Sequence, residues 1–219
     1  MNTDYSENLF SDLSTSFTDS LLHSPMLMQS KDTALLIIDV QERLIQAVDD
    51  QKQIVWNIRR LIDAANVLCI EMAATEQYPQ RLGHTIELIA KRIVHKPYPK
   101  MSFSCVRCAE ILQQFRKSGI SKILLCGIEA HVCVLQTALD LISNDYQVFV
   151  AVDAIASRRR IDYEFALRRM ESVGVTLTTT ESVMFEWCHR ADRVEFKTIS
   201  NLVKAVSYTH LTLPTKRIV

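Results

Sequence analysis

Residues 122–141 read KILLCGIEAHVCVLQTALDL, and this stretch decides the fold class. Its first part, residues 122–128, is a short apolar run that predicts a buried strand of a parallel sheet. Residues 131–145 carry apolar side chains at helical spacing, and Cys133 falls in the first turn of that helix. The stretch therefore predicts a strand followed directly by a helix, with a thiol at the junction.

Strands and helices alternate in the same way along the rest of the chain. Further strands are predicted at residues 33–41, 69–77, 147–155 and 175–181. Helices are predicted at residues 51–68, 84–94, 107–119, 161–174, 181–189 and 193–205. Residues 95–104 contain two prolines and are predicted to form a loop. This alternation favours a three-layer, doubly wound α/β fold, in which a Rossmann-like, mostly parallel sheet has helices on both faces.

The composition is typical of a globular protein without a strongly charged partner. The chain has 219 residues, of which 48% are hydrophobic, so a single α/β domain with a full core is expected. Its 25 basic and 25 acidic residues balance, which argues against nucleic acid or a membrane as partner. The apolar runs are shorter than the roughly 20 residues that span a bilayer. The chain also lacks a glycine-rich phosphate loop, which argues against nucleotide binding.

Three regions are predicted along the chain: an N-terminal arm at residues 1–30, the α/β domain at 31–206 and a tail at 207–219. The arm contains no Lys or Arg and resembles neither a signal peptide nor a transit peptide, so a cytoplasmic location is expected. The tail does not continue the last predicted helix and resembles translated vector sequence. A non-native origin of the tail is therefore a hypothesis.

Six cysteines are too few for a disulfide framework in a chain of this length. Cys69 and Cys126 lie in apolar segments and are expected to be small buried hydrophobic residues. Cys105 and Cys108 form a C-x-x-C pair. A zinc site would need two further ligands at similar spacing, and a redox pair would follow a strand and open a helix. A structural role is favoured for this pair, with a redox protein as an alternative function.

Three chemically complementary residues are expected at one edge of the sheet. Asp39 ends the first predicted strand, Lys100 lies in the predicted loop, and Cys133 follows the strand at 122–128. In an open parallel sheet, ligands bind beyond the carboxyl ends of the strands. The helix N-terminus and the Lys100 ammonium would favour the Cys133 thiolate, and Asp39 would exchange the proton as general acid and base. Each residue alone is unremarkable, but together they predict a nucleophilic hydrolase site.

Four motifs resemble those of the isochorismatase-like cysteine hydrolase superfamily, and of isochorismatase domain-containing proteins in particular. They are ALLIIDVQERL at 34–44, TEQYPQRLG at 75–83, the lysine three residues before Phe103, and GIEAHVCVLQTALDL at 127–141. The resemblance extends over residues 33–204. It implies a six-stranded parallel sheet, a homo-oligomer, and a catalytic triad of Asp39, Lys100 and Cys133. It also implies a cis peptide between Ile128 and Glu129, with the amides of Glu129 and Cys133 forming an oxyanion site.

The substrate is predicted less closely than the chemistry. Nicotinamidases of the superfamily carry an Asp-x-His metal site after the second strand, whereas this chain reads TEQYPQRLGH there. A nicotinamidase is therefore disfavoured, and neither a metal nor an organic cofactor is expected. Gln77, Phe103 and His131 are candidate walls of the substrate pocket. The predicted function is hydrolysis of an amide or related C–N bond of a small molecule through a thioester. The alternative is a non-catalytic scaffold or ligand-binding protein with the same fold.

Overall fold

A computed structural model describes residues 24–205, so the predicted tail and all but residues 24–30 of the predicted arm lie outside the described part. Six parallel strands form one sheet in the order β3-β2-β1-β4-β5-β6. They are β1 (Thr33–Ile38), β2 (Glu71–Gln77), β3 (Tyr98–Lys100), β4 (Lys122–Ile128), β5 (Gln147–Ala156) and β6 (Thr176–Thr178). The predicted doubly wound α/β fold is confirmed.

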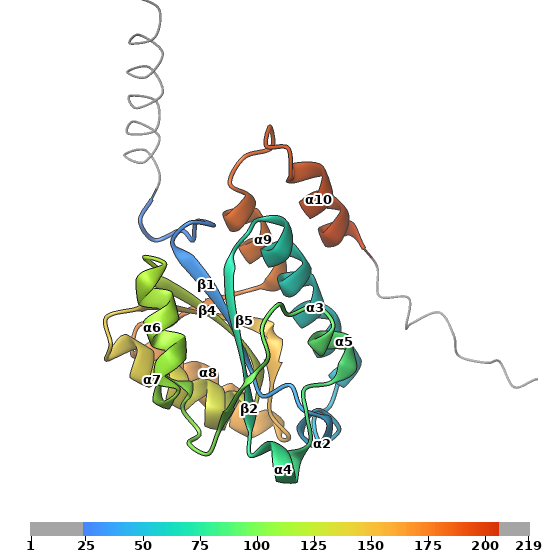
Figure 1. The fold of residues 1–219 in the computed structure, drawn as a ribbon, viewed down its shortest axis with the longest axis vertical. Helices are drawn as coiled ribbons and strands as arrows, with labels where there is room; N and C mark the ends of the chain where they lie inside the picture. The colour runs from blue at the N-terminus through green and yellow to red at the C-terminus, as the bar shows by residue number, and fades with distance from the viewer. Residues whose placement is uncertain (1–23, 206–219) are drawn as a thin grey trace, which may run out of the picture.

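Helices cover both faces of the sheet (Figure 1). Helices α6 (Ala109–Lys117), α7 (Leu135–Ile142) and α8 (Arg160–Ser172) lie on one face, and α3 (Gln51–Val67), α9 (Thr180–Cys188) and α10 (Phe196–Lys204) lie on the other. Short helices α2 (Glu42–Ile45), α4 (Pro79–Leu82) and α5 (Glu87–Ala90) occupy the connections that follow β1 and β2. The longest described helix, α3, has 17 residues, and none of the described helices has the length and hydropathy that a bilayer crossing requires.

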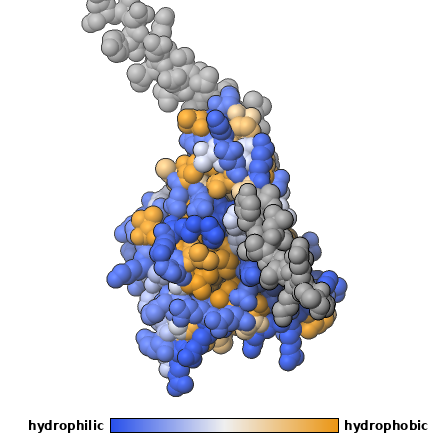
Figure 2. Space-filling view, turned by 90° about the vertical axis from the view of Figure 1, so that its right-hand side faces the viewer, coloured by the Kyte–Doolittle hydropathy of each residue, from blue (hydrophilic) through white to orange (hydrophobic). Residues whose placement is uncertain are grey.

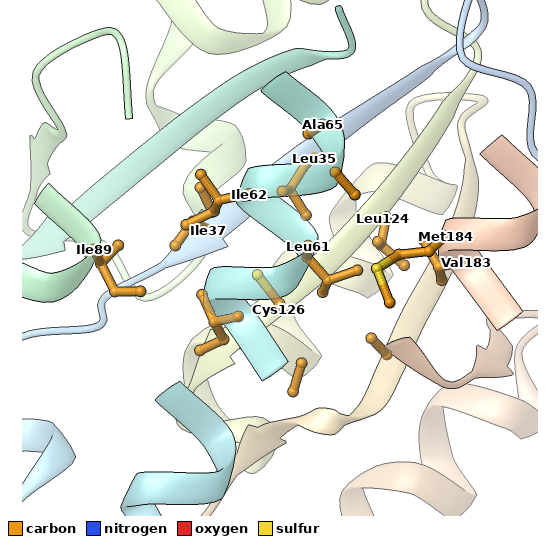
Figure 3. Close-up of a cluster of buried hydrophobic side chains, with 14 of the residues drawn as sticks. Leu35, Ile37, Leu61, Ile62, Ala65, Ile89, Leu124, Cys126, Val183 and Met184 are labelled. Atoms are coloured by element: carbon orange, nitrogen blue, oxygen red, sulfur yellow. The ribbon is translucent and has the colours of Figure 1, made fainter. Parts of the chain in front are cut away.

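Each face of the sheet has its own hydrophobic core, because side chains of a strand alternate between the two faces. Leu35 and Ile37 of β1 pack in the core beneath α3 and α9, which Figure 3 shows together with Cys126. Leu36 and Ile38 pack in the other core, beneath α6, α7 and α8. All residues of β1 and β4 are buried, as expected for central strands of a parallel sheet.

One predicted loop contains a strand. Residues 95–104 include β3, whose three residues pair in parallel with Thr75–Gln77 of β2. Proline is tolerated there because β3 is an edge strand, in which one side of the backbone needs no partner. Tertiary pairing therefore overrides the local signal of the prolines, and it turns the five strands predicted from apolar runs into six.

The strand order places a topological switch point between β1 and β4. The chain leaves β1 toward β2 on one side, whereas it leaves β4 toward β5 on the other side. The two connections diverge at the carboxyl ends of these strands, which is where open α/β sheets bind ligands. A candidate site is therefore expected where Asp39 follows β1 and Cys133 follows β4.

Candidate active site

The structure brings Asp39, Lys100 and Cys133 together at the switch point. Lys100 ends β3, and its Nζ lies 2.7 Å from Asp39 Oδ2 and 3.6 Å from Cys133 Sγ. The side chains of Asp39 and Lys100 are 0% and 1% exposed, and Cys133 is 5% exposed as a residue. A carboxylate, an ammonium and a thiol thus share one nearly closed space.

The backbone around Gly127 lets β4 approach the end of β1. Gly127 pairs with Ile38, the residue before Asp39, and has φ +118°. A Cβ atom at Gly127 would lie 2.0 Å from the carbonyl oxygen of Ile38. Glycine is therefore required here both for its positive φ and for the close approach that places the thiol segment beside Asp39.

Cys133 lies in a π-helical turn rather than in a regular first turn of a helix. The turn spans Ala130–Val134, and the Val134 N–H donates to the Glu129 carbonyl at 3.2 Å. Helix α7 follows directly from Leu135. Single π-helical turns of this kind often occur at functional sites. The predicted helix at 131–145 thus has an irregular beginning at the nucleophile candidate.

The Lys100 ammonium is held by oxygen atoms in addition to Asp39. Its Nζ lies 2.8 Å from Gln77 Oε1, and 3.2 and 3.0 Å from the carbonyl oxygens of Ser102 and Phe103. Burial lowers the pKa of Lys100, but the nearby negative charges, led by Asp39, outweigh it and leave the pKa raised. Lys100 therefore stays charged at neutral pH.

The pKa of the Cys133 thiol is raised, in contrast to the thiolate expected from the sequence. Burial is the main cause, and the Asp39 charge and its hydrogen bond with the thiol add to it, while Lys100 acts in the opposite direction. The sequence indicated the cation and the helix terminus, but it did not indicate how completely the sulfur is enclosed. The resting thiol is consequently protonated at neutral pH, and it interacts with the Asp39 carboxylate through a hydrogen bond.

Two buried polar residues near the site were not predicted. The Thr75 hydroxyl donates to Asp39 Oδ1 at 2.8 Å, so each carboxylate oxygen of Asp39 has a donor of its own. The Gln41 side chain accepts from the Gln77 N–H at 2.7 Å and donates to the Gln77 carbonyl at 3.0 Å. Gln41 follows the apolar strand β1 and Thr75 lies within β2, and neither position reveals the hydrogen-bond partner of the residue.

Gln77 and Phe103, the predicted pocket walls, both lie at Lys100. Gln77 is buried, and its amide is used on both sides, since Oε1 accepts from Lys100 and Nε2 donates to the Met101 carbonyl at 2.9 Å. Phe103 contributes its carbonyl oxygen to Lys100, while the residue is 51% exposed. Gln77 therefore orders the segment that surrounds the ammonium, and Phe103 contributes its backbone carbonyl to that segment.

Glu129 and His131 lie between β4 and the start of α8. The peptide bond between Ile128 and Glu129 is cis. The Glu129 carboxylate accepts from both the backbone N–H and the Nε of Arg158, at 3.1 and 2.8 Å. His131 Nδ1 lies 2.9 Å from Ser157 Oγ. Both side chains are thus engaged by the segment that follows β5.

The C-x-x-C pair lies next to the site without forming a bond. Both cysteines are buried free thiols, and Cys105 Sγ lies 3.5 Å from Thr75 Oγ1. Burial raises the pKa of Cys105 to about 12 and also raises that of Cys108. The burial of both thiols agrees with the structural role that the sequence favours for this pair. Cys69, expected to be buried, is exposed.

Among residues 24–205, no group of three or more His, Cys, Asp or Glu side chains is arranged to hold a metal ion. In particular, His84 Nδ1 lies 3.2 Å from Glu76 Oε2, and this carboxylate also accepts from the N–H and hydroxyl of Thr85. The segment that holds the metal site in nicotinamidases therefore forms a local hydrogen-bond cluster here.

Known proteins are similar to this chain in both sequence and fold. The family model of the isochorismatase domain matches residues 33–182. Isochorismatase domain-containing protein 2 from Bos taurus is 39% identical over 174 residues, which are 79% of this chain and 83% of that protein. Isochorismatase domain-containing protein 1 from Salmo salar is 35% identical over 176 residues, which are 79% of this chain but 61% of that longer protein.

A solved structure of MAR1 ribonuclease from Caenorhabditis elegans is also similar. It has a TM-score of 0.76 and 34% identity, and the match covers 87% of this chain and 99% of that chain. The region matched by the family model contains Asp39, Lys100 and Cys133 and is well over half of the sequence. The chain belongs to the isochorismatase family.

Proposed function

We propose that the protein is a cysteine hydrolase that cleaves an amide or related C–N bond of a small molecule through a thioester. The observation that carries the proposal is the buried Lys100 ammonium, which contacts the Asp39 carboxylate at 2.7 Å and the Cys133 sulfur at 3.6 Å. A base, a cation and a nucleophile at the switch point of the sheet are the groups that acyl transfer needs.

In the first half of the proposed reaction, Asp39 takes the thiol proton while the Cys133 sulfur attacks the carbonyl carbon. Transfer accompanies attack, because the raised pKa of Cys133 keeps the resting thiol protonated. The amides of Glu129 and Cys133 donate to the oxyanion of the tetrahedral intermediate. Asp39 then gives its proton to the nitrogen, the C–N bond breaks, the amine leaves and the acyl group remains on sulfur.

In the second half, a water molecule replaces the amine. Asp39 takes a proton from the water as its oxygen attacks the thioester carbonyl. The second tetrahedral intermediate expels the sulfur, which recovers a proton from Asp39, and the carboxylic acid leaves. Lys100 remains charged throughout and holds the Asp39 carboxylate in place.

The test is acyl-enzyme trapping with a panel of small aliphatic and aromatic amides, with isochorismate as a vinyl ether comparison. A substrate should add its acyl mass to the peptide that contains Cys133. Cys133→Ala should lose the adduct and reduce turnover by about a thousandfold or more. Cys126→Ala is the matched control, because Cys126 is a buried thiol of β4 that packs in the opposite core. Undiminished turnover by Cys133→Ala would refute the nucleophile.

A ligand-binding protein without catalysis is the second candidate, and the enclosed, protonated thiol favours it. It predicts that an amide from the panel binds at the same site but forms no adduct and is not turned over. Calorimetry first establishes which amide binds. Intact-protein mass spectrometry then shows whether that amide forms an adduct, which separates the two functions. A redox function would instead be lost in Cys105→Ser and kept in Cys133→Ala.

Ribonuclease activity, named for the Caenorhabditis elegans relative, is less well supported. A phosphodiester substrate brings negative charge to a site whose base is a buried carboxylate, and the whole chain has a formal net charge of +0. We expect no cleavage of a single-stranded RNA under conditions in which an amide substrate is hydrolysed. RNA cleavage that disappears in Cys133→Ala would contradict this expectation.

A further inference from the structure

A cavity lies between α2, the first half of α3 and α5. It has a volume of about 370 Å³, which is in the range of small-molecule sites, and none of Asp39, Lys100 and Cys133 lines it. Its apolar lining consists of Ile45, Val55, Trp56, Ile86 and Leu88. Figure 2 views the side of the molecule on which α3 and α5 lie and shows an apolar patch bordered by hydrophilic side chains.

Two cations and one carboxylate also line this cavity: Lys52, Arg59 and Glu42. No ion pair joins these cations to a carboxylate within the described residues. The Arg59 guanidinium lies over the ring of Trp56, with Cζ 5.4 Å from the ring centroid. Its Nε atom is buried and has no hydrogen-bond partner in the described part of the chain.

A buried guanidinium N–H without an acceptor needs an explanation, because such groups almost always have a partner. An acceptor for Arg59 Nε would have to reach an enclosed atom beside an aromatic ring, and the cavity has one more positive than negative side chain. A carboxylate is the acceptor that guanidinium geometry suits best. The remaining wall of the cavity suits a hydrocarbon or aromatic group.

We propose that this cavity binds a small monocarboxylate with an apolar or aromatic body. The carboxylate pairs with Arg59 and Lys52, and the body packs against Trp56 and Leu88. The site does not depend on the thiol chemistry proposed above. It does contact α2, which begins at Glu42, three residues after Asp39, so the ligand would rest on the helix that follows the proposed base.

The experiment is a titration of the protein with 4-phenylbutyrate, followed through the indole N–H signals of its two tryptophans. Trp56 lines the cavity, whereas Trp187 is 0% exposed in the core and serves as internal reference. We expect a saturable shift of the Trp56 signal without a shift of Trp187. The neutral 4-phenylbutanol should bind at least about fivefold more weakly, because it lacks the charge that pairs with Arg59.

Amino-acid substitutions test whether 4-phenylbutyrate binds in this cavity. Arg59→Gln should weaken binding of 4-phenylbutyrate about tenfold, and Lys52→Gln about threefold. Arg116→Gln removes an exposed cation of α6 on the opposite face and should have no effect. If Arg59→Gln does not fold, Lys52→Gln and Leu88→Glu carry the test, since both positions are exposed. Cys133→Ala should bind like the unchanged protein, which separates this site from the proposed active site.

Four results would overturn the proposal. One is the absence of a Trp56 shift at millimolar 4-phenylbutyrate. Another is equal affinity for the alcohol, or no effect of Arg59→Gln and Lys52→Gln. The last is a change of oligomeric state in Leu88→Glu, measured by light scattering, together with no binding of 4-phenylbutyrate by the unchanged protein. That result would make the cavity part of an interface between copies of the chain.

Discussion

At the scale of single residues, Asp39 affects Cys133 in two opposing ways. It disfavours the thiolate, and in the proposed mechanism it is the group that accepts the thiol proton. Its carboxylate accepts from Lys100 and Thr75 and interacts with the thiol. The negative charge of Asp39 raises the pKa of the thiol, although Asp39 is also the acceptor that the proposed mechanism needs for the thiol proton. Thiolate formation and catalysis should therefore respond to Asp39 in opposite directions.

Asp39→Asn tests this opposition. Loss of the charge should lower the pKa of Cys133 and increase its alkylation by iodoacetamide at pH 7–8 about tenfold. Hydrolysis of a substrate found by acyl trapping should be lost, because asparagine cannot accept the proton. Peptide mass spectrometry over time measures the alkylation, with the exposed Cys69 as reference.

Lys100→Met is the control, because it should change the pKa of Cys133 in the opposite direction. It removes the cation that lowers the pKa of Cys133, so alkylation of Cys133 should become slower. Breaking the buried pair costs about 3 to 5 kcal/mol in either variant, so folding must be verified. Labelling of Cys126, which is 0% exposed, reports unfolded protein. Slower alkylation of Cys133 in a folded Asp39→Asn protein would contradict the assigned effect of the carboxylate.

The sequence allowed Asp39 and Cys133 to be named because they follow apolar strands, whereas Lys100, in a predicted loop, could be named only in combination with them and with the family motifs. Thr75 and Arg158 could not be named in the same way. Their roles depend on which atom meets which across strands, as when Thr75 reaches Asp39 across the β1–β2 pair. The raised pKa of Cys133 was also not predictable, since it depends on burial by residues distant in sequence.

At the scale of elements, the junction of β1 and β4 depends on one glycine. Gly127→Ala should destabilise the fold by on the order of 3 kcal/mol or more, because its Cβ would lie 2.0 Å from the Ile38 carbonyl oxygen. Gly119→Ala is the matched control, since Gly119 also has positive φ but no atom within 4 Å of the added Cβ. It should cost about 1 kcal/mol.

Urea unfolding measures both glycine variants. Gly119→Ala gives the cost of a positive φ without a contact, so the additional loss in Gly127→Ala reflects the strand contact together with the less accessible φ of +118°. Equal stability of Gly127→Ala and Gly119→Ala would contradict the close approach of β4 to β1. Because Ile38 precedes Asp39, a folded Gly127→Ala protein should also react differently at Cys133.

The elements differed in how well they could be predicted. Strands β1 and β4 were predicted because every residue in them is buried, and their sequences are continuous apolar runs. Strand β3 has three residues, two of which are exposed or half-buried, and it exists because Thr75–Gln77 of β2 offers a pairing edge. The local sequence around β3 gives no information on this edge of β2.

At the scale of the whole molecule, the alternation of elements predicted a parallel sheet but not the order of its strands. Pairing of β1 with both β2 and β4 sets the switch point, and this pairing is long-range in sequence. The formation of a homo-oligomer stays a prediction.

The two cores on either side of the sheet contain Cys126 and Cys105 as buried free thiols, and these give the folded chain a pH dependence.

Stability should fall at alkaline pH, and Cys126 allows the effect to be measured. Burial raises the pKa of the Cys126 thiol above its ordinary value of 9.0. Above pH 9 the unfolded chain therefore loses this proton while the folded chain keeps it, so the free energy of unfolding falls as pH rises toward the folded-state pKa. Below pH 9 both states keep the proton, and the contribution of Cys126 is constant. One retained proton corresponds to about 1.4 kcal/mol per pH unit.

Cys126→Ala should reduce the alkaline slope by about this amount, whatever its effect on stability at pH 7. Urea unfolding between pH 7 and pH 10.5 under reducing conditions gives the slope. Cys69→Ser, at an exposed position, is the control and should leave the slope unchanged, because burial is the cause of the effect. An unchanged slope in Cys126→Ala would mean that the thiol ionises within the folded core, and that solvent reaches the space between β4 and α3.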